Sequence, residues 1–208
     1  LNLDCLMRMH RDSDFEVFRK AEQVKCINPE KDLSRNELDS YISFCQQNGA
    51  KGMAWMKVTD KGLESNIVKF FKPDIQKKLL QKTKAKKNSV LMFIADRPKM
   101  VASVLDKLRL RLRDDLKLIK DNDFKFCWVV DFPLFEWDEE NGKWEASHHI
   151  FTAPKKEHID LLEKEPGKVY ADLYDLVLNG VELGSGSIRE TNPEVQEKVM
   201  KVIGIKKE

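Results

Sequence analysis

The sequence lacks an apolar run long enough to span a membrane, and no signal peptide opens it. Its 37 basic residues barely outnumber its 35 acidic ones, which argues against a dedicated nucleic-acid coat but permits a local basic face. It has no phosphate-loop or dinucleotide-binding glycine pattern. Metal-site spacing is also missing among its four cysteines, which we interpret as structural thiols of a cytoplasmic protein: Cys5, Cys26, Cys45 and Cys127.

What is present suits a globular protein with a substantial interior. Hydrophobic residues make up 41% of the 208 positions and charged residues 35%, so apolar cores can form beneath a polar surface. A chain of this length holds one large domain or two small ones. Because Leu1 rather than methionine comes first, we expect a piece of a longer protein.

Helices are predicted in four stretches where apolar residues recur at helical spacing behind a start signal. One begins after the cap Ser34, two begin at Pro73 and Pro98, and the fourth has Asn192 as its cap and Pro193 in its first turn. Short apolar runs at residues 53–58 and 90–95 have the length of buried strands.

Later strands are predicted by aromatic and valine-rich runs and by two Asn-Gly turns. Residues 126–137 form a long strand signal in which Pro133 suggests an edge or a bulge. The pairs at 141–142 and 179–180 each predict a hairpin. The polar stretch 120–123 separates these hairpins from the first part, so we predict an α+β protein with domains at 1–120 and 121–208.

The first domain resembles a known insertion domain. The segments GAKGMAWMKV at 49–58 and SNIVKFF at 65–71 are similar to the GAD domain of bacterial-type aspartyl-tRNA synthetases, which also occurs in a subunit of tRNA-dependent amidotransferases. The resemblance implies a two-layer α+β unit with helices on one face of an antiparallel sheet. Residues 7–14 depart from the family's glycine- and proline-containing segment there.

Two basic groups in this domain have two interpretations: solvated surface, which charge runs usually are, or a face that meets tRNA phosphates. They comprise Lys77, Lys78, Lys82, Lys84, Lys86 and Lys87, and then Arg109, Arg111 and Arg113.

The second domain combines titratable side chains with small residues in strand-like surroundings. The segments are HHIFTAP at 148–154 and NGVELGSGSIR at 179–189. They resemble the late catalytic segments of bacterial-type aspartyl-tRNA synthetases, as do DFPLFE at 131–136 and YDLVLNG at 174–180. The similarity is nearly continuous from residue 126 to residue 205 and implies part of a class II synthetase antiparallel sheet.

The resemblance also implies roles for five residues. Arg189 matches the arginine that grips the aspartate side chain, a task suited to the planar guanidinium fork. Glu182 matches the glutamate that contacts ATP and Mg²⁺, with Asp175 as a second acid beside the metal. His148 matches a histidine that contacts aspartate, and His149 is its neighbour. Taken singly, the histidines suit a strand end or loop, and Glu182 with Arg189 suits a surface ion pair.

The implied parent protein is a class II aspartate–tRNA ligase that uses ATP, L-aspartate and tRNA and forms a homodimer. The dimer-interface motif, the phosphate-gripping arginines and the anticodon-binding barrel have no counterpart in these residues, so we expect the isolated chain to be inactive. Two alternatives stay open: a non-catalytic tRNA-binding GAD module, or a synthetase paralogue without activity. Whether the parent also charges tRNA specific for asparagine depends largely on parts that are not in this sequence.

The hairpin turn makes a geometric prediction. A two-residue turn at 179–180 pairs Val177 with Glu182 and puts Asp175 and Glu182 on one face. Strict alternation puts Arg189 on the other face, so we predict a bulge within 184–187 that returns Arg189 towards His148. Ile150 stands where the family has proline, so we expect a less rigid loop after the histidines. Ser185 replaces a glycine of the family, at a place where backbone and ligand approach each other. Neither departure removes a side chain that we expect to do chemistry.

Overall fold

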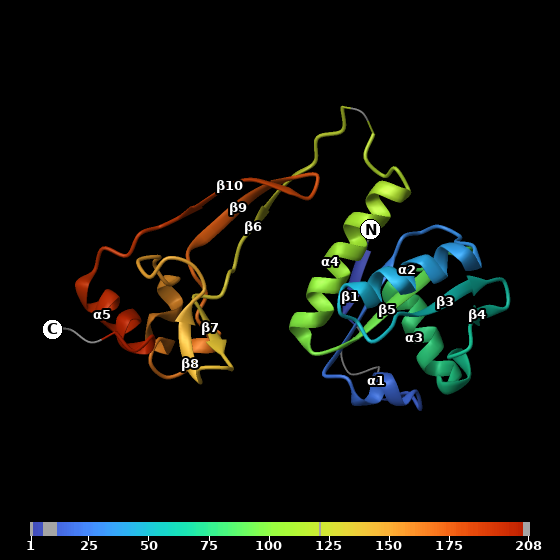
Figure 1. The fold of residues 1–208 in the computed structure, drawn as a ribbon, viewed down its shortest axis with the longest axis horizontal. Coiled ribbons are helices and arrows are strands. Elements are labelled where there is room, and N and C mark those ends of the chain that lie inside the picture. The colour runs from blue at the N-terminus through green and yellow to red at the C-terminus, as the bar shows by residue number, and fades with distance from the viewer. Residues whose placement is uncertain (1, 6–11, 121, 206–208) are drawn as a thin grey trace. The chain divides into compact units, whose positions relative to one another are not determined.

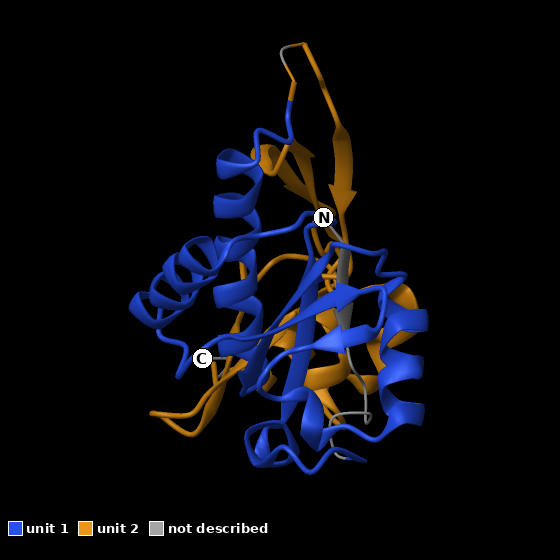
Figure 2. Ribbon diagram, turned by 90° about the vertical axis from the view of Figure 1, so that its right-hand side faces the viewer, with its two compact units in different colours: residues 1–119 blue, residues 120–208 orange. Residues whose placement is uncertain are grey.

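The computed structural model describes residues 2–5, 12–120 and 122–205. The chain divides into two compact units, residues 1–119 and 120–208, and each is described by itself (Figures 1 and 2). Part of the departure at 7–14, and position 121 in the predicted boundary, lie outside the described residues. No helix among the described residues is long and apolar enough to cross a membrane.

Unit 1 is built on a five-stranded antiparallel sheet with strand order β1-β2-β5-β3-β4 (Figure 1). The strands are β1 Asn2–Cys5, β2 Gln23–Asn28, β3 Ala54–Thr59, β4 Gly62–Glu64 and β5 Val90–Asp96. The helices are α1 Glu16–Lys20, α2 Arg35–Gln47, α3 Pro73–Thr83 and α4 Pro98–Asp115, with a 3₁₀ turn, η2, at Val68–Phe70. The predicted α+β class is confirmed, and so are the three helices that begin after Ser34, at Pro73 and at Pro98.

Helices cover both faces of this sheet, which differs from the one covered face that the resemblance implies. Val90, Met92 and Ile94 of β5 pack with side chains of α2 and α4. Leu91 and Phe93, which point the other way along the same strand, pack with side chains of α1 and α3. Because both faces are covered, β5 is an unbroken apolar run rather than an alternating one.

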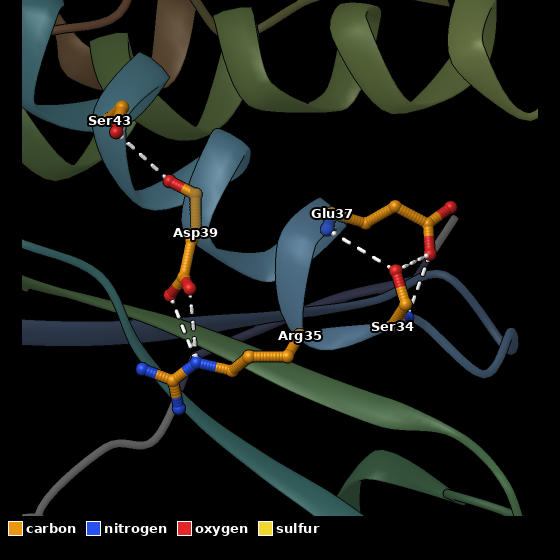
Figure 3. Close-up of polar contacts among 5 residues, drawn as sticks. All are labelled: Ser34, Arg35, Glu37, Asp39 and Ser43. Atoms are coloured by element: carbon orange, nitrogen blue, oxygen red, sulfur yellow. Dashed lines mark hydrogen bonds and ion pairs between the residues drawn. The ribbon is translucent and has the colours of Figure 1, made fainter.

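Helix α2 begins with a complete capping box (Figure 3). The Glu37 amide donates to the Ser34 hydroxyl over 3.3 Å, and the Ser34 amide donates to the Glu37 carboxylate over 2.7 Å. Two otherwise unpaired amides at the helix start are thereby satisfied. Further along the helix, the Ser43 hydroxyl donates to the Asp39 carbonyl at 3.0 Å. That carbonyl already accepts the backbone hydrogen bond of the helix. On the buried side of the helix, desolvation raises the pKa of the Cys45 thiol to about 12.

Unit 2 contains a three-stranded sheet, order β10-β9-β6, and a separate β7-β8 hairpin. Its elements are β6 Phe126–Val129, β7 Phe135–Asp138, β8 Lys143–Ala146, η3 Lys156–Leu161, η4 Pro166–Lys168, β9 Leu173–Leu178, β10 Val181–Ser187 and α5 Pro193–Val202. Both predicted hairpins and the helix behind Asn192 are confirmed, and Gly204 follows α5 with φ +80°.

The long strand signal at 126–137 is two strands in different sheets, so its interpretation as one element was wrong. Asp131 adopts a left-handed φ of 61°, which turns the chain between β6 and β7. Pro133 has no amide proton to donate and makes only an isolated bridge with Tyr170. Leu134 and Phe135 then enter the small core of this unit, which also contains Leu162, Val169, Ala171, Leu173, Val195 and Val199.

Replacing Ser34 with alanine should weaken α2 through the loss of its cap. Caps of this type contribute about 1 kcal/mol, which corresponds to roughly fivefold faster amide exchange in the helix. Hydrogen exchange read by mass spectrometry on the α2 peptide measures the effect. Ser43→Ala is the matched control, because that hydroxyl bonds a carbonyl that the helix already satisfies. Equal exchange in the two variants would show that the capping box contributes nothing.

Candidate functional site

The β9–β10 hairpin brings Asp175 and Glu182 to one face, as predicted. Asn179 and Gly180 form a two-residue turn in which both φ values are positive, 51° and 86°. Glu182 lies opposite Val177, and Asp175 follows two positions away on the same side of β9. Residues related in this diagonal way are about 7–8 Å apart, within reach of one shared cation.

An irregularity in β10 brings Arg189 back to that same face. The register shifts between Glu182 and Gly184, so that Leu183 is an extra residue, and Ser185 then lies opposite Asp175. From Ser185 onward, alternation places every second residue, Arg189 included, on the side of the acids. The predicted bulge therefore exists, but its predicted position within 184–187 was wrong.

The bulge falls at Leu183 because that residue is exposed, whereas Gly186 has to lie directly opposite Tyr174. Leu183 is 54% exposed, so its displacement from the ladder disturbs no packing. Gly186 lies directly opposite Tyr174, and a Cβ there would stand 2.6 Å from Cζ of the tyrosine ring. Glycine at 186 thus lets the Tyr174 ring approach β10 closely. The same ring meets Trp128 of the other neighbouring strand, β6, edge-on at 5.5 Å. Gly184 has no such neighbour within 4 Å.

The loop that carries the two histidines is joined to the end of β10 by backbone hydrogen bonds. The Ala153 amide donates to the Ile188 carbonyl at 2.8 Å, and the Glu190 amide donates to the Phe151 carbonyl at 2.9 Å. Between these two bonds, Thr152 and Arg189 form an antiparallel bridge. Two segments about forty positions apart in the sequence therefore lie side by side, and the histidine loop meets Arg189.

The two histidines make different contacts. The His149 ring is stacked on Phe151, with centroids 5.1 Å apart and planes within 5°, and the Arg189 guanidinium lies 4.5 Å from the centre of the same ring. His148 instead meets Phe132 edge-on at 5.4 Å. Both histidines and Arg189 are exposed. Within residues 2–5, 12–120 and 122–205, no carboxylate pairs with Arg189, so its donors are available to a ligand.

Two hydrogen bonds hold the loop at Ile150, where the family's proline is missing. The Gln196 side chain, on α5, donates to the Ile150 carbonyl at 2.9 Å. Beside it, the Thr152 amide donates to the His149 carbonyl at 3.0 Å and closes a tight turn. A helix from later in the chain thus supplies a constraint that proline supplies through its own ring.

Three contributors to this site were missed at the level of sequence. Phe151 lies in the recognised segment but was given no role, and Gln196 was seen only as part of a helix. Lys155 forms an ion pair with Asp131, which raises the pKa of the lysine and ties the left-handed turn before β7 to the start of η3, after the histidine loop. Only the aromatic residue next to the histidines carried a signal that could have been followed.

Asp175 and Glu182 offer two carboxylates on one face of the hairpin. Carboxylate oxygens are the ligands that Mg²⁺ prefers, and Mg²⁺ commonly binds through one or two carboxylates and completes its shell with water and substrate phosphates. In the described parts of the chain, no group of three or more His, Cys, Asp or Glu is placed to hold a metal.

The antiparallel sheet of unit 2 has two acids and an unpaired arginine on one face, and comparison with known families identifies the class of protein. The chain belongs to the class II tRNA synthetases of the D, K and N group, whose family model matches residues 4–208. The match includes both units.

Among its relatives, the chain is 48% identical over 204 residues to an aspartate–tRNA(Asp/Asn) ligase of Brachyspira hyodysenteriae, covering 95% of this chain and 35% of the relative. It is 43% identical to the aspartate–tRNA(Asp/Asn) ligase of Anoxybacillus flavithermus, over 100% of this chain and 36% of the relative. It is also 43% identical to the aspartate–tRNA ligase of Enterococcus faecalis, over 95% and 35%. The chain thus spans about a third of the length of these relatives.

Gly186→Ala should disrupt the hairpin, because the new methyl group meets the Tyr174 ring. Overpacking of this kind costs about 1–3 kcal/mol, so amide exchange in β9 and β10 should rise at least about fivefold. Gly184→Ala is the matched control, since a methyl group there has open space around it. If both variants exchange like the unsubstituted chain, the close approach of Tyr174 to β10 is not a constraint on the fold.

Proposed function

We propose that this chain supplies the aspartate-binding and part of the ATP-binding surface of an aspartate–tRNA ligase. In the reaction, the α-carboxylate of aspartate attacks the α-phosphorus of ATP, forming aspartyl adenylate and releasing pyrophosphate. A terminal ribose hydroxyl of tRNA then attacks the adenylate carbonyl and releases AMP. The observation that carries the proposal is the unpaired Arg189 guanidinium, on the side of Asp175 and Glu182 and joined to the histidine loop.

Arg189 is proposed to bind the side-chain carboxylate of aspartate. A guanidinium presents two parallel N–H groups that match the two carboxylate oxygens, and a charged partner strengthens both hydrogen bonds. His149 and His148, on the loop bridged to Arg189, are proposed to contact the rest of the amino acid. Uncharged asparagine offers this guanidinium one oxygen and a competing NH₂ group, so the arrangement favours the acid.

Glu182 and Asp175 are proposed to hold Mg²⁺ against the ATP phosphates, with Glu182 also contacting the nucleotide. Bound there, the ion neutralises phosphate charge and helps hold the bent phosphate chain. The residues themselves position and orient the substrates, and none acts as a nucleophile or as a general acid or base. Catalysis of this kind comes from placing two reactants together and stabilising the charge that develops between them.

Unit 1 is proposed to be the GAD-type insertion domain and to face tRNA. Its arginine group is largely neutralised on its own helix, since Arg109 pairs with Asp106 and Arg111 with Asp115. The interpretation of Arg109, Arg111 and Arg113 as solvated surface is therefore the stronger one. Along α3, Lys77, Lys78 and Lys82 carry no ion pair within the described parts of the chain and are the better candidates for phosphate contacts.

The same proposal includes a homodimeric parent and a cytoplasmic location. The alternative of a non-catalytic tRNA-binding module is disfavoured, because the class II match runs through the catalytic hairpin as well as unit 1. A paralogue without activity differs from a ligase only in what the complete protein catalyses, which the next experiment measures.

Arg189→Lys, made in the complete protein, should raise KM for aspartate at least about 30-fold, because a lysine ammonium cannot make the bidentate contact. Glu182→Gln should instead lower kcat and raise the Mg²⁺ concentration needed for half-maximal rate. Aspartate-dependent exchange of pyrophosphate into ATP measures both effects, and asparagine in place of aspartate is the substrate control. No exchange by the unsubstituted protein would reject the ligase in favour of an inactive paralogue.

The 208-residue chain by itself should exchange pyrophosphate only at background. The resemblance places the arginines that hold the α- and γ-phosphates in segments with no counterpart here, and each supplies transition-state charge stabilisation. The same assay, run with the purified chain beside the complete protein, tests this. Clear aspartate-dependent exchange by the chain alone would mean that these residues contain a phosphate-binding arginine that we have not recognised.

A further inference from the structure

Phe151 contacts two of the proposed aspartate-binding side chains at once. The Arg189 guanidinium carbon lies 4.5 Å from the centre of its ring, and the His149 imidazole is stacked on it in a nearly parallel plane. The ring is 43% exposed and does not belong to the apolar core of unit 2. A large apolar side chain that packs against a cation and an imidazole, outside the core, requires an explanation other than stability.

Main-chain bonds hold the backbone of Phe151 beside the end of β10. The Phe151 carbonyl accepts from the Glu190 amide at 2.9 Å, one residue beyond Arg189. The next residue, Thr152, is 1% exposed and bridges Arg189 directly. Phe151 and Arg189 are therefore fixed to each other through main-chain bonds, and the cation–ring contact does not depend on a mobile loop tip.

The chemistry of the contact suits an arginine that must stay free for a carboxylate. An aromatic face attracts a guanidinium through its quadrupole but accepts none of its N–H groups in a conventional hydrogen bond. A carboxylate in the same place would hold Arg189 by consuming the donors that the substrate needs. A bare aliphatic neighbour would leave the long side chain to sample many rotamers, and ordering it would then cost binding free energy.

We propose that Phe151 is a positioning residue for aspartate recognition, which holds the Arg189 guanidinium ready without occupying its donors and aligns His149 beside it. The role rests on the proposed function. It makes the aspartate pocket a stacked assembly, His149 and Arg189 on one ring, rather than a set of independent side chains.

The test uses the complete protein and steady-state pyrophosphate exchange. Phe151→Leu and Phe151→Met keep most of the apolar volume but remove the aromatic face, whereas Phe151→Tyr keeps it. Loss of a cation–π contact corresponds to about a 3- to 30-fold change in binding. We expect KM for aspartate to rise by that factor in the leucine and methionine variants, while KM for ATP, kcat and the values for Phe151→Tyr stay within about twofold.

His149→Ala separates the two contacts of the ring. If Phe151 acts on Arg189, Phe151→Leu still raises KM for aspartate when His149 is already alanine. An effect that vanishes in that background would assign the ring to His149 alone and overturn the role at Arg189. Trp137→Leu is the control for a general loss of exposed aromatic surface, since Trp137 is 50% exposed and contacts Trp144 on the β7–β8 hairpin.

Several outcomes would overturn the inference while leaving the proposed function intact. These are an unchanged KM for aspartate in both the leucine and methionine variants, an equal loss in Phe151→Tyr, or parallel changes in the KM values for ATP and aspartate. Circular dichroism identifies a variant that fails to fold, and the other non-aromatic variant then decides. Absence of aspartate-dependent exchange in the unsubstituted protein would reject the proposed function, and this role with it.

Discussion

One additional residue in β10 determines which side chains in unit 2 can act together. In a regular antiparallel ladder, the offset of seven positions from Glu182 to Arg189 would put them on opposite faces of the sheet. The register shift between Glu182 and Gly184 changes that parity, so Ser185 lies beside Asp175 and the chain leaves the strand with Arg189 on the acidic side. The main-chain bridge between Thr152 and Arg189 then attaches the histidine loop at the same place. The groups proposed to bind the metal and the amino acid share a surface for this reason.

The opposite face of the same sheet has a different character. Trp128 and Tyr174, which meet edge-on, lie on the face away from the acids, and Gly186 makes room for the tyrosine ring. The apolar core of unit 2 lies around Leu134, Phe135 and α5, and the hairpin contributes Leu173, at the start of β9, to it. The hairpin that carries Glu182 is thus supported mainly by its own ladder, its two-residue turn and the Asn179 side chain, which bonds the chain before β6. Position and chemistry in this site depend on backbone pairing more than on packing.

The helix starts of both units show how far local patterns predicted the fold. Ser34, Pro73, Pro98 and Asn192 each marked a helix start correctly, because capping and first-turn proline geometry are determined by a few adjacent residues. The number of helix layers in unit 1 was not predicted correctly, because helices cover both faces of its sheet. The unbroken apolar run of β5 contained the signal, since a strand with one solvent-exposed face would alternate. The long run at 126–137 failed for the opposite reason: its composition is strand-like throughout, and only the left-handed turn at Asp131 divides it.

The sequence by itself determined the turn at Asn179-Gly180, the shared face of Asp175 and Glu182, and the family to which the candidate residues belong, because each depends on neighbouring residues or on a short motif. Only the tertiary structure decided the position of the bulge, the bridge between Thr152 and Arg189, the hold of Gln196 on the Ile150 carbonyl and the contact of Phe151 with Arg189. The last three of these features join segments that lie about forty residues apart. Their geometry is set by competition among close approaches, such as that of Tyr174 to Gly186, which no local pattern records.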